Sequence, residues 1–313
     1  MERFLTAFAV TAGAIILLLL IASLLIFFKI FYAARKKSRG KQEFPLPEGA
    51  PYEPHHAQMI EWIKQIRAMD RKDASITSFD GLTLRGKYYE HKKGAPIEIM
   101  FHGYRGTAER DLCGGVHRCF EIGHNALIVD QRGAGESDGH VITFGARESR
   151  DCRSWIDFVI KSIDPNARII LTGISMGAAT VMLAAGEPLP KNVIGVLADC
   201  GYTSTRDIIK KVIRDMHLPA APIYPLVRLG ARLFGGFDPD KDAPIKAMER
   251  CTLPVIFFHG DADDFVPCSM SEKNFAACRS EKKHLVIIPG AGHGLCFPVD
   301  PEGYLKELAA FFP

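Results

Sequence analysis

The strongest constraint on the fold of this chain is a regular alternation of short apolar runs with longer stretches of helical periodicity. Four of the six runs are rich in Ile, Val and Leu, as expected for strands that are covered on both faces of a parallel sheet. Strand and helix patterns that alternate in this way predict a doubly wound α/β sheet. The expected strands are Ile97–Phe101, Ala126–Asp130, Arg168–Thr172, Val193–Asp199, Val255–His259 and His284–Pro289.

Helical patterns fill the spaces between these runs, and a hairpin precedes them. Ser75–Phe79 and Leu82–Tyr89 flank Asp80-Gly81, which is a signal for a two-residue hairpin turn. Before the hairpin, Met59, Ile63, Ile66 and Met69 recur at helical spacing. The expected helices are His56–Asp70, Ala108–Ile122, Arg147–Ile163, Met176–Ala185, Ser271–Arg279 and Pro301–Phe312.

The segment Thr205–Arg250 is too long for a single crossover between two strands. It contains two helical patterns, Asp207–Met216 and Tyr224–Phe234, and the stretch Pro219–Pro222 separates them. We therefore predict a small helical cap, at about residues 205–250, inserted over the carboxyl edge of the sheet.

The N-terminal segment Phe4–Phe28 contains no charged residue. As a helix, 25 residues are long enough to cross a bilayer core of about 30 Å. A secretory signal peptide has a shorter apolar core followed by small residues at its cleavage site. Here the bulky residues Phe31 and Tyr32 precede the nearest small ones. The segment therefore predicts a single transmembrane anchor at residues 4–28, in contact with the lipid bilayer.

Basic residues are distributed unevenly around this segment. Because Lys and Arg are enriched in cytoplasmic flanks, we expect the large domain on the cytoplasmic side. Among the basic residues, only Arg3 precedes the apolar segment. The basic residues that follow the segment are Lys29 and the cluster Arg35, Lys36, Lys37, Arg39 and Lys41.

Four prolines between Gln42 and Pro54 exclude a regular helix or a central strand there. Such a stretch is typical of a semi-rigid spacer. We therefore divide the chain into an anchor with its basic flank (residues 1–41), a Pro-rich linker (42–54) and an α/β domain (55–313).

Composition argues against several classes of function. The net charge is only +3 and the positive excess lies in the basic cluster, so nothing indicates a nucleic-acid surface. The eight cysteines form no C-x-x-C pair and no Cys/His spacing typical of zinc, and we expect neither a metal nor an organic cofactor. Most cysteines fall in or beside expected core elements, where a free thiol behaves as a small apolar group. This usage favours a reducing compartment.

The pentapeptide Gly173-Ile174-Ser175-Met176-Gly177 follows an expected strand and opens an expected helix. A G-x-S-x-G at such a junction makes a sharp turn that exposes the serine hydroxyl above the sheet. Glycines are needed there because the neighbouring backbone approaches closely. Ser175 is therefore the candidate nucleophile.

A serine hydroxyl becomes a nucleophile only beside a base, and the base needs an acceptor that fixes its tautomer. His293 follows the last expected strand between small residues, and Asp263 follows the strand Val255–His259. We assign His293 as the base and Asp263 as the acid. Asp261 and Asp264 are close alternatives for the acid, and Asp199, which ends another strand, is a more distant one.

An acyl-transfer site also needs N–H donors for the developing oxyanion. The loop Phe101–Gly106 follows the strand Ile97–Phe101 and can aim a backbone N–H at that position. We assign the oxyanion hole to the backbone N–H groups of Tyr104 and Met176.

Taken together, these motifs resemble the α/β-hydrolase superfamily, and within it a membrane-anchored, serine-aminopeptidase-like and esterase-like branch. The resemblance covers about Ser75 to the C-terminus and implies an eight-stranded, mostly parallel sheet. It also implies a Ser-His-Asp triad at Ser175, His293 and Asp263, and a structural role for the loop after Asp130. The motifs are His102-Gly103, Asp130-x-Arg132-Gly133-x-Gly135-x-Ser137, Gly173-x-Ser175-x-Gly177, His259-Gly260-x-x-Asp263-x-x-Val266-Pro267 and Gly292-His293.

The favoured function is a serine hydrolase that cleaves carboxylic esters through an acyl-enzyme intermediate. The apolar cap and the anchor suggest a lipid-like or acyl substrate. A peptidase or amidase on the same triad is an alternative, and would need charged groups in the cap to hold a peptide end. A third alternative is a non-catalytic binding module with a hydrolase fold, although such a module has no physical need for an intact triad. The basic residues available in the cap are Arg206, Lys210, Lys211 and Arg214.

Overall fold

Eight strands form a single sheet in the order β1-β2-β4-β3-β5-β6-β7-β8. Strands β3 to β8 run parallel to one another, whereas β1 pairs antiparallel with β2, and β2 with β4. The computed structural model describes residues 1–34 and 43–312. The strands are β1 (Lys72–Thr77), β2 (Thr83–Tyr89), β3 (Ile97–Phe101), β4 (Asn125–Val129), β5 (Ile169–Ile174), β6 (Val193–Asp199), β7 (Val255–Gly260) and β8 (Lys283–Ile288). The six expected apolar runs are the six parallel strands, and the predicted sheet is confirmed.

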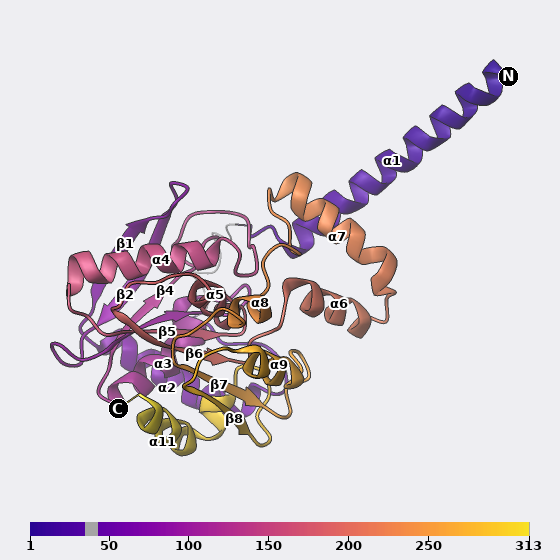
Figure 1. Cartoon of the computed structure of the whole chain (residues 1–313). Coiled ribbons are helices and arrows are strands. Elements are labelled where there is room, and N and C mark those ends of the chain that lie inside the picture. The colour runs from indigo at the N-terminus through magenta and orange to yellow at the C-terminus, as the bar shows by residue number, and fades with distance from the viewer. Residues whose placement is uncertain (35–42, 313) are drawn as a thin grey trace.

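Helices cover both faces of the sheet, and one long helix projects away from it (Figure 1). A 3-10 turn at Glu53–His55 precedes α2, and a π-helical turn at Val159–Ile163 continues α4. The helices are α1 (Glu2–Ile30), α2 (His56–Ala68), α3 (Ala108–Glu121), α4 (Glu148–Phe158), α5 (Met176–Ala185), α6 (Thr205–Asp215), α7 (Ala220–Phe234), α8 (Pro244–Met248), α9 (Ser269–Ala277), α10 (Cys296–Val299) and α11 (Pro301–Phe311).

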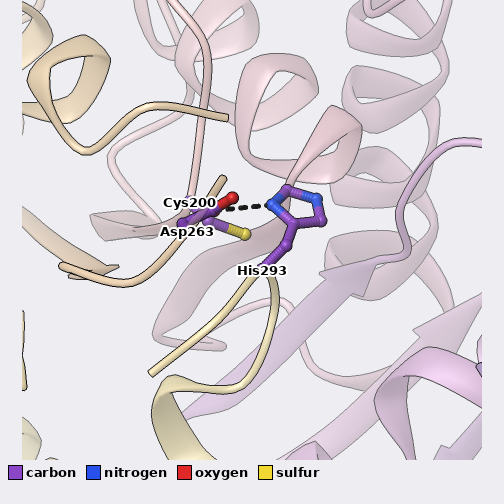
Figure 2. Close-up of side chains that lie close together, drawn as sticks. All are labelled: Cys200, Asp263 and His293. Atoms are coloured by element: carbon purple, nitrogen blue, oxygen red, sulfur yellow. Dashed lines mark hydrogen bonds and ion pairs between the residues drawn. The ribbon is translucent and has the colours of Figure 1, made fainter. Parts of the chain in front are cut away.

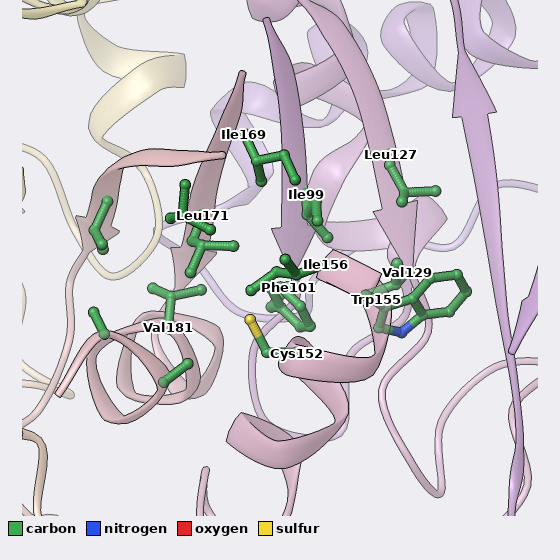
Figure 3. Close-up of a cluster of buried hydrophobic side chains, with 14 of the residues drawn as sticks. Ile99, Phe101, Leu127, Val129, Cys152, Trp155, Ile156, Ile169, Leu171 and Val181 are labelled. Atoms are coloured by element: carbon green, nitrogen blue, oxygen red, sulfur yellow. The ribbon is translucent and has the colours of Figure 1, made fainter. Parts of the chain in front are cut away.

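Alternate residues of the buried strands supply two separate cores. On one face, Ile99 and Phe101 of β3 pack with Trp155 of α4 and Val181 of α5 (Figure 3). On the other face, Met100 belongs to a cluster that includes residues of α2, α3 and α11. Because successive side chains of a strand point to opposite faces, one short strand can serve both layers.

The turn between β1 and β2 differs from the expected two-residue hairpin. The backbone N–H of Ser78 donates to the carbonyl of Leu82 at 2.8 Å, so the loop holds three residues, 79–81. Gly81 closes it with a φ of +89°, as in the common three-residue loop that ends in a left-handed residue. The Ser78 hydroxyl donates to the Asp80 carboxylate at 2.7 Å and stabilises this longer turn.

The cap consists of α6 and α7, and α7 crosses the C-terminal part of α1 (Figure 1). The two expected cap helices are present, but the break between them lies at residues 216–219 rather than at Pro219–Pro222, because α7 already begins at Ala220. Proline is tolerated in the first turn of a helix, where its missing N–H would have had no partner. A further proline, Pro225, lies inside α7.

Residues 43–54, the described part of the expected linker, lie against the domain. Phe44, Leu46 and Tyr52 are half-buried against the core that contains α2, and His56 Nε2 lies 2.9 Å from the carbonyl oxygen of Pro47. The basic cluster at residues 35–41 falls outside the described residues.

Helix α1 is the one helix of the described chain that is long and apolar enough to cross a membrane. Most of its large apolar side chains are exposed up to Phe28, whereas Phe27 is buried. Most of α1 is therefore exposed, whereas part of its C-terminal end is buried against the rest of the protein.

Candidate active site

Ser175 lies between β5 and α5 on a turn with little room for side chains. Its φ is +57°, in the left-handed region that few non-glycine residues adopt. A Cβ at Gly173 would lie 2.1 Å from the carbonyl oxygen of Gly177, and a Cβ at Gly177 would lie 1.9 Å from that of Phe101. These two glycines let β5, the turn and β3 approach closely, and the turn presents Ser175 at the carboxyl edge of the sheet.

Two loops from the same edge bring the other sequence-predicted residues to Ser175. His293 follows β8, and its Nε2 lies 2.9 Å from Ser175 Oγ. Asp263 follows β7, and its Oδ2 lies 2.7 Å from His293 Nδ1. Asp263 and His293 are 30 positions apart in the chain, and Ser175 and His293 are 118 apart. The three residues nevertheless form one hydrogen-bonded series.

The Asp263 carboxylate is buried and accepts several hydrogen bonds. Its Oδ1 accepts the backbone N–H groups of Phe265 at 3.0 Å and Val266 at 2.8 Å. Burial alone would raise the pKa of this carboxyl, but hydrogen bonds with His259, His293 and the Val266 N–H outweigh burial and lower the pKa below its ordinary value. Asp263 is therefore ionised at neutral pH.

An ionised Asp263 determines how the imidazole of His293 can be protonated. A carboxylate only accepts, so Nδ1 must carry a proton and donate it to Asp263. In the neutral imidazole the other nitrogen, Nε2, is then free to accept the hydroxyl proton of Ser175. This is the arrangement that general-base activation of a serine requires.

His259 takes part in this site in a way that the sequence analysis did not predict. Its Nε2 lies 2.8 Å from the carbonyl oxygen of Val266 and 3.2 Å from Asp263 Oδ2, and its Nδ1 lies 2.6 Å from Ser271 Oγ. The fully buried ring holds the loop that carries Asp263. The sequence feature that could have indicated this contact is the spacing of four residues between His259, at the end of β7, and Asp263.

The three alternatives for the acid, Asp199, Asp261 and Asp264, make no hydrogen bond to His293 among the described residues. Asp199 accepts the hydroxyl of Tyr304 at 3.1 Å, and burial raises its pKa. Asp261 accepts the backbone N–H of Gly290 at 2.6 Å, and Asp264 is exposed. Among the described carboxylates, Asp263 is the one with a hydrogen bond to His293.

The two residues assigned to the oxyanion hole flank Ser175. Met176 opens α5, where the first N–H groups have no partner inside the helix. The N–H of Gly103 is occupied by Asp111 Oδ2 at 3.0 Å, which leaves Tyr104 as the next donor in that loop. The loop is close to the serine, because a Cβ at Gly103 would lie 3.6 Å from Ser175 Cβ.

The loop after β4 has the structural contacts that the resemblance implied. Asp130 accepts the backbone N–H groups of Ala108 at 2.8 Å and of Glu136 at 2.9 Å. Arg132 is buried and pairs with both Asp80 and Asp151.

Two cavities of about 500 Å³ each meet at Ser175. The first also contains His293 and carries the charged residues Glu48, Arg110, Asp111 and Asp264, together with Tyr52. The second is apolar and is enclosed by α6, α7 and the last residues of α1. A substrate with one polar and one apolar part could therefore place the bond between them at the serine.

Cys200 lies beside Asp263 and His293, as Figure 2 shows. Its Sγ, a carboxylate oxygen of Asp263 and a ring nitrogen of His293 lie within 4.8 Å of one another. Burial raises the pKa of this thiol well above its ordinary value, whereas a cysteine binds a metal as the thiolate. The donor set therefore does not favour a metal ion.

Comparison with known proteins identifies relatives that match most of this chain. The model of the alpha/beta hydrolase family matches residues 99–307. The protein YqkD of Bacillus subtilis is 26% identical over 250 residues, which cover 80% of this chain and 81% of YqkD. The protein Rv2307c of Mycobacterium tuberculosis is 28% identical over 236 residues, covering 74% and 73%.

A solved structure, the esterase Pf2001 of Pyrococcus furiosus, has a TM-score of 0.66 and 22% identity to this chain. The match covers 79% of this chain and 92% of the esterase. Together with the family match, this likeness confirms the α/β-hydrolase fold.

The crowding around the serine turn leads to a testable contrast between two glycines. We expect Gly177→Ala to lower the melting temperature, because overpacking costs about 1–3 kcal/mol and the clash is with backbone. Gly292→Ala is the matched control, since its Cβ would make only ordinary contacts, 3.5 Å from Leu295 Cδ1. Thermal unfolding of both variants checks this. Equal melting temperatures for the two variants would contradict the account of the turn.

Proposed function

The chain belongs to the alpha/beta hydrolase family, and we propose that it is a serine hydrolase that cleaves carboxylic esters through an acyl-enzyme intermediate. The observation that carries the proposal is the hydrogen-bonded series from Asp263 through His293 to Ser175, at the meeting point of a charged and an apolar cavity.

The proposed reaction follows from the positions of these atoms. Ser175 Oγ attacks the ester carbonyl carbon while His293 Nε2 takes the hydroxyl proton. The oxyanion is stabilised by the N–H groups of Tyr104 and Met176, each worth about 2.7–4 kcal/mol in comparable sites. When the tetrahedral intermediate collapses, the carbon–oxygen bond to the alcohol breaks and His293 returns the proton to the leaving oxygen. Water, activated by the same nitrogen, then releases the carboxylic acid and regenerates Ser175.

The contacts of the cap favour an ester over a peptide substrate. Arg206 pairs with Asp240 at 2.9 Å, and Lys211 pairs with Asp215 at 2.6 Å. Lys210 lies 5.1 Å from the ring centroid of Tyr224. Three of the four basic residues that a peptidase could use are therefore engaged, and the fourth, Arg214, is exposed. None of the four lines the cavity under the cap, which is apolar.

We propose that α1 anchors this enzyme in a membrane, with the α/β domain on the cytoplasmic side. Length and apolarity support the anchor, and the basic residues that follow the helix support the orientation. Cleavage after α1, as for a signal peptide, would remove side chains that are buried in the domain, such as Phe27.

The hydrolytic proposal is tested by the kinetics of a short ester such as p-nitrophenyl butyrate. We expect Ser175→Ala and His293→Ala each to lower kcat by about a million-fold. Asp263→Asn should lower it by about ten-thousand-fold, because the wrong tautomer of His293 is then favoured.

The control for Asp263→Asn is Asp261→Asn, which changes an exposed neighbour outside both cavities. Its amide oxygen can still accept the Gly290 N–H, so kcat should be unchanged. Equal losses in both aspartate variants would show that the acid is misassigned. A wild-type enzyme that cleaves the matching p-nitroanilide as fast as the ester would favour the amidase alternative.

The membrane proposal is tested by extraction and by protease protection. We expect the chain to stay in the membrane pellet after washing with alkaline carbonate, because a spanning helix is held by its apolar surface. In intact cells, protease added outside should leave the domain uncut. Release into the wash would contradict the anchor, and digestion from outside would contradict the orientation.

A further inference from the structure

We propose that α1 is a wall of the substrate site as well as an anchor, and that the cavity between α1, α6 and α7 holds the long acyl chain of a membrane lipid ester. This inference rests on the proposed function, since it requires Ser175 to cleave an ester. It adds that Ile26 and Ile30 of the anchor help to set the preferred chain length.

The C-terminal part of α1 is packed into the domain. Phe27 and Phe31 belong to the same apolar cluster as Met176, the residue after the proposed nucleophile. Helix α7 crosses this part of α1 (Figure 1). A Cβ at Gly230 of α7 would lie 2.5 Å from the carbonyl oxygen of Ser23 in α1. Small residues at this crossing let the two helices touch, as they do between membrane helices.

Hydrogen bonds also fix the end of α1 to the loop that carries the proposed oxyanion donor. The Tyr104 hydroxyl donates to the carbonyl of Ile30 at 2.6 Å, and Arg105 donates to the carbonyls of Lys29 at 2.9 Å and Tyr32 at 3.0 Å. The last carbonyls of a helix have no partner within it and carry partial negative charge, so a guanidinium is favourable there. The anchor is therefore held in a defined position relative to Ser175.

The length of α1 permits both roles. The helix has 29 residues, whereas about 20 are enough to cross the hydrocarbon core. The residues from Ser23 onward can therefore pack against the cap while the preceding ones span the bilayer. Lys29, the first charged residue after the apolar segment, would lie at the membrane surface, where lysines extend their ammonium groups toward water.

The cavity has the lining that an acyl chain requires. Ile26 and Ile30 form its α1 side, Ile208 and Ile213 come from α6, and Leu226 from α7. Ser175 lies in the same cavity, so a chain bound there would carry its carboxyl end to the nucleophile. Lys29 is the one charged side chain among the described residues that line it.

The exposed rim of the cavity is also apolar. Met216 is 51% exposed, Leu218 is 44% exposed and Phe265 is 41% exposed, and all three line it. Exposed apolar patches of this kind mark contacts with ligands or membranes. The rim lines the same cavity as Ile26 and Ile30 of α1, so we infer that an acyl chain enters this cavity from the lipid around the proposed anchor. The alcohol part of the ester would then lie in the charged cavity on the other side of Ser175.

The test compares p-nitrophenyl butyrate with p-nitrophenyl laurate, using the full-length enzyme in detergent micelles. In wild type, we expect each added methylene that the cavity holds to raise kcat/KM about fourfold. Ile26→Trp, which fills the α1 side, should lower kcat/KM for laurate at least tenfold and leave butyrate within twofold. Leu226→Trp, on the α7 side of the same cavity, should do the same.

Leu25→Trp is the matched control, because Leu25 adjoins Ile26 on α1 but is 64% exposed. It should leave both esters unchanged. The inference is overturned if wild type cleaves butyrate but shows no gain with chain length, or if the Ile26 and Leu226 variants lose activity equally on both esters. If wild type cleaves neither ester and no serine is reactive, the proposed function itself has failed.

Discussion

The close contact of backbone around Ser175 is the constraint on which the rest of the site depends. Side chains are excluded at Gly173 and Gly177 because carbonyl oxygens lie about 2 Å from where their Cβ atoms would be. The serine consequently takes a left-handed φ of +57° at the end of β5. A parallel sheet brings the loops after β7 and β8 to the same edge, and the histidine and the aspartate approach the hydroxyl from there.

Helix α1 and the residues around Ser175 are joined by direct contacts. Tyr104 supplies a backbone N–H to the proposed oxyanion hole, while its hydroxyl holds the end of α1. Its neighbour Arg105 makes two further hydrogen bonds to the same helix end. A segment that composition alone would assign only to membrane attachment thus encloses the apolar cavity next to the serine. Membrane attachment and substrate choice would then be properties of the same helix.

Local patterns in the sequence were sufficient for the parallel strands and for most helices, because burial on both faces leaves continuous apolar runs. The residues assigned to the triad could also be placed, since each follows an expected strand and parallel strands end at the same edge of a sheet. Contacts between distant segments were not predictable. Nothing local shows that Phe27 packs on the cap, or that Glu98, inside an apolar run, is buried with Arg118 and His124. Side-chain hydrogen bonds likewise lengthened the turn at Ser78 beyond its dipeptide signal.

A fluorophosphonate probe tests whether Ser175 is an activated nucleophile. Such a probe forms a covalent adduct only with a serine that a neighbouring base has activated. Mass spectrometry of the intact, folded protein and of its peptides should show one adduct, on Ser175, which His293→Ala removes. A folded protein that gains no adduct, or gains one at another serine, would show that Ser175 is not the activated nucleophile.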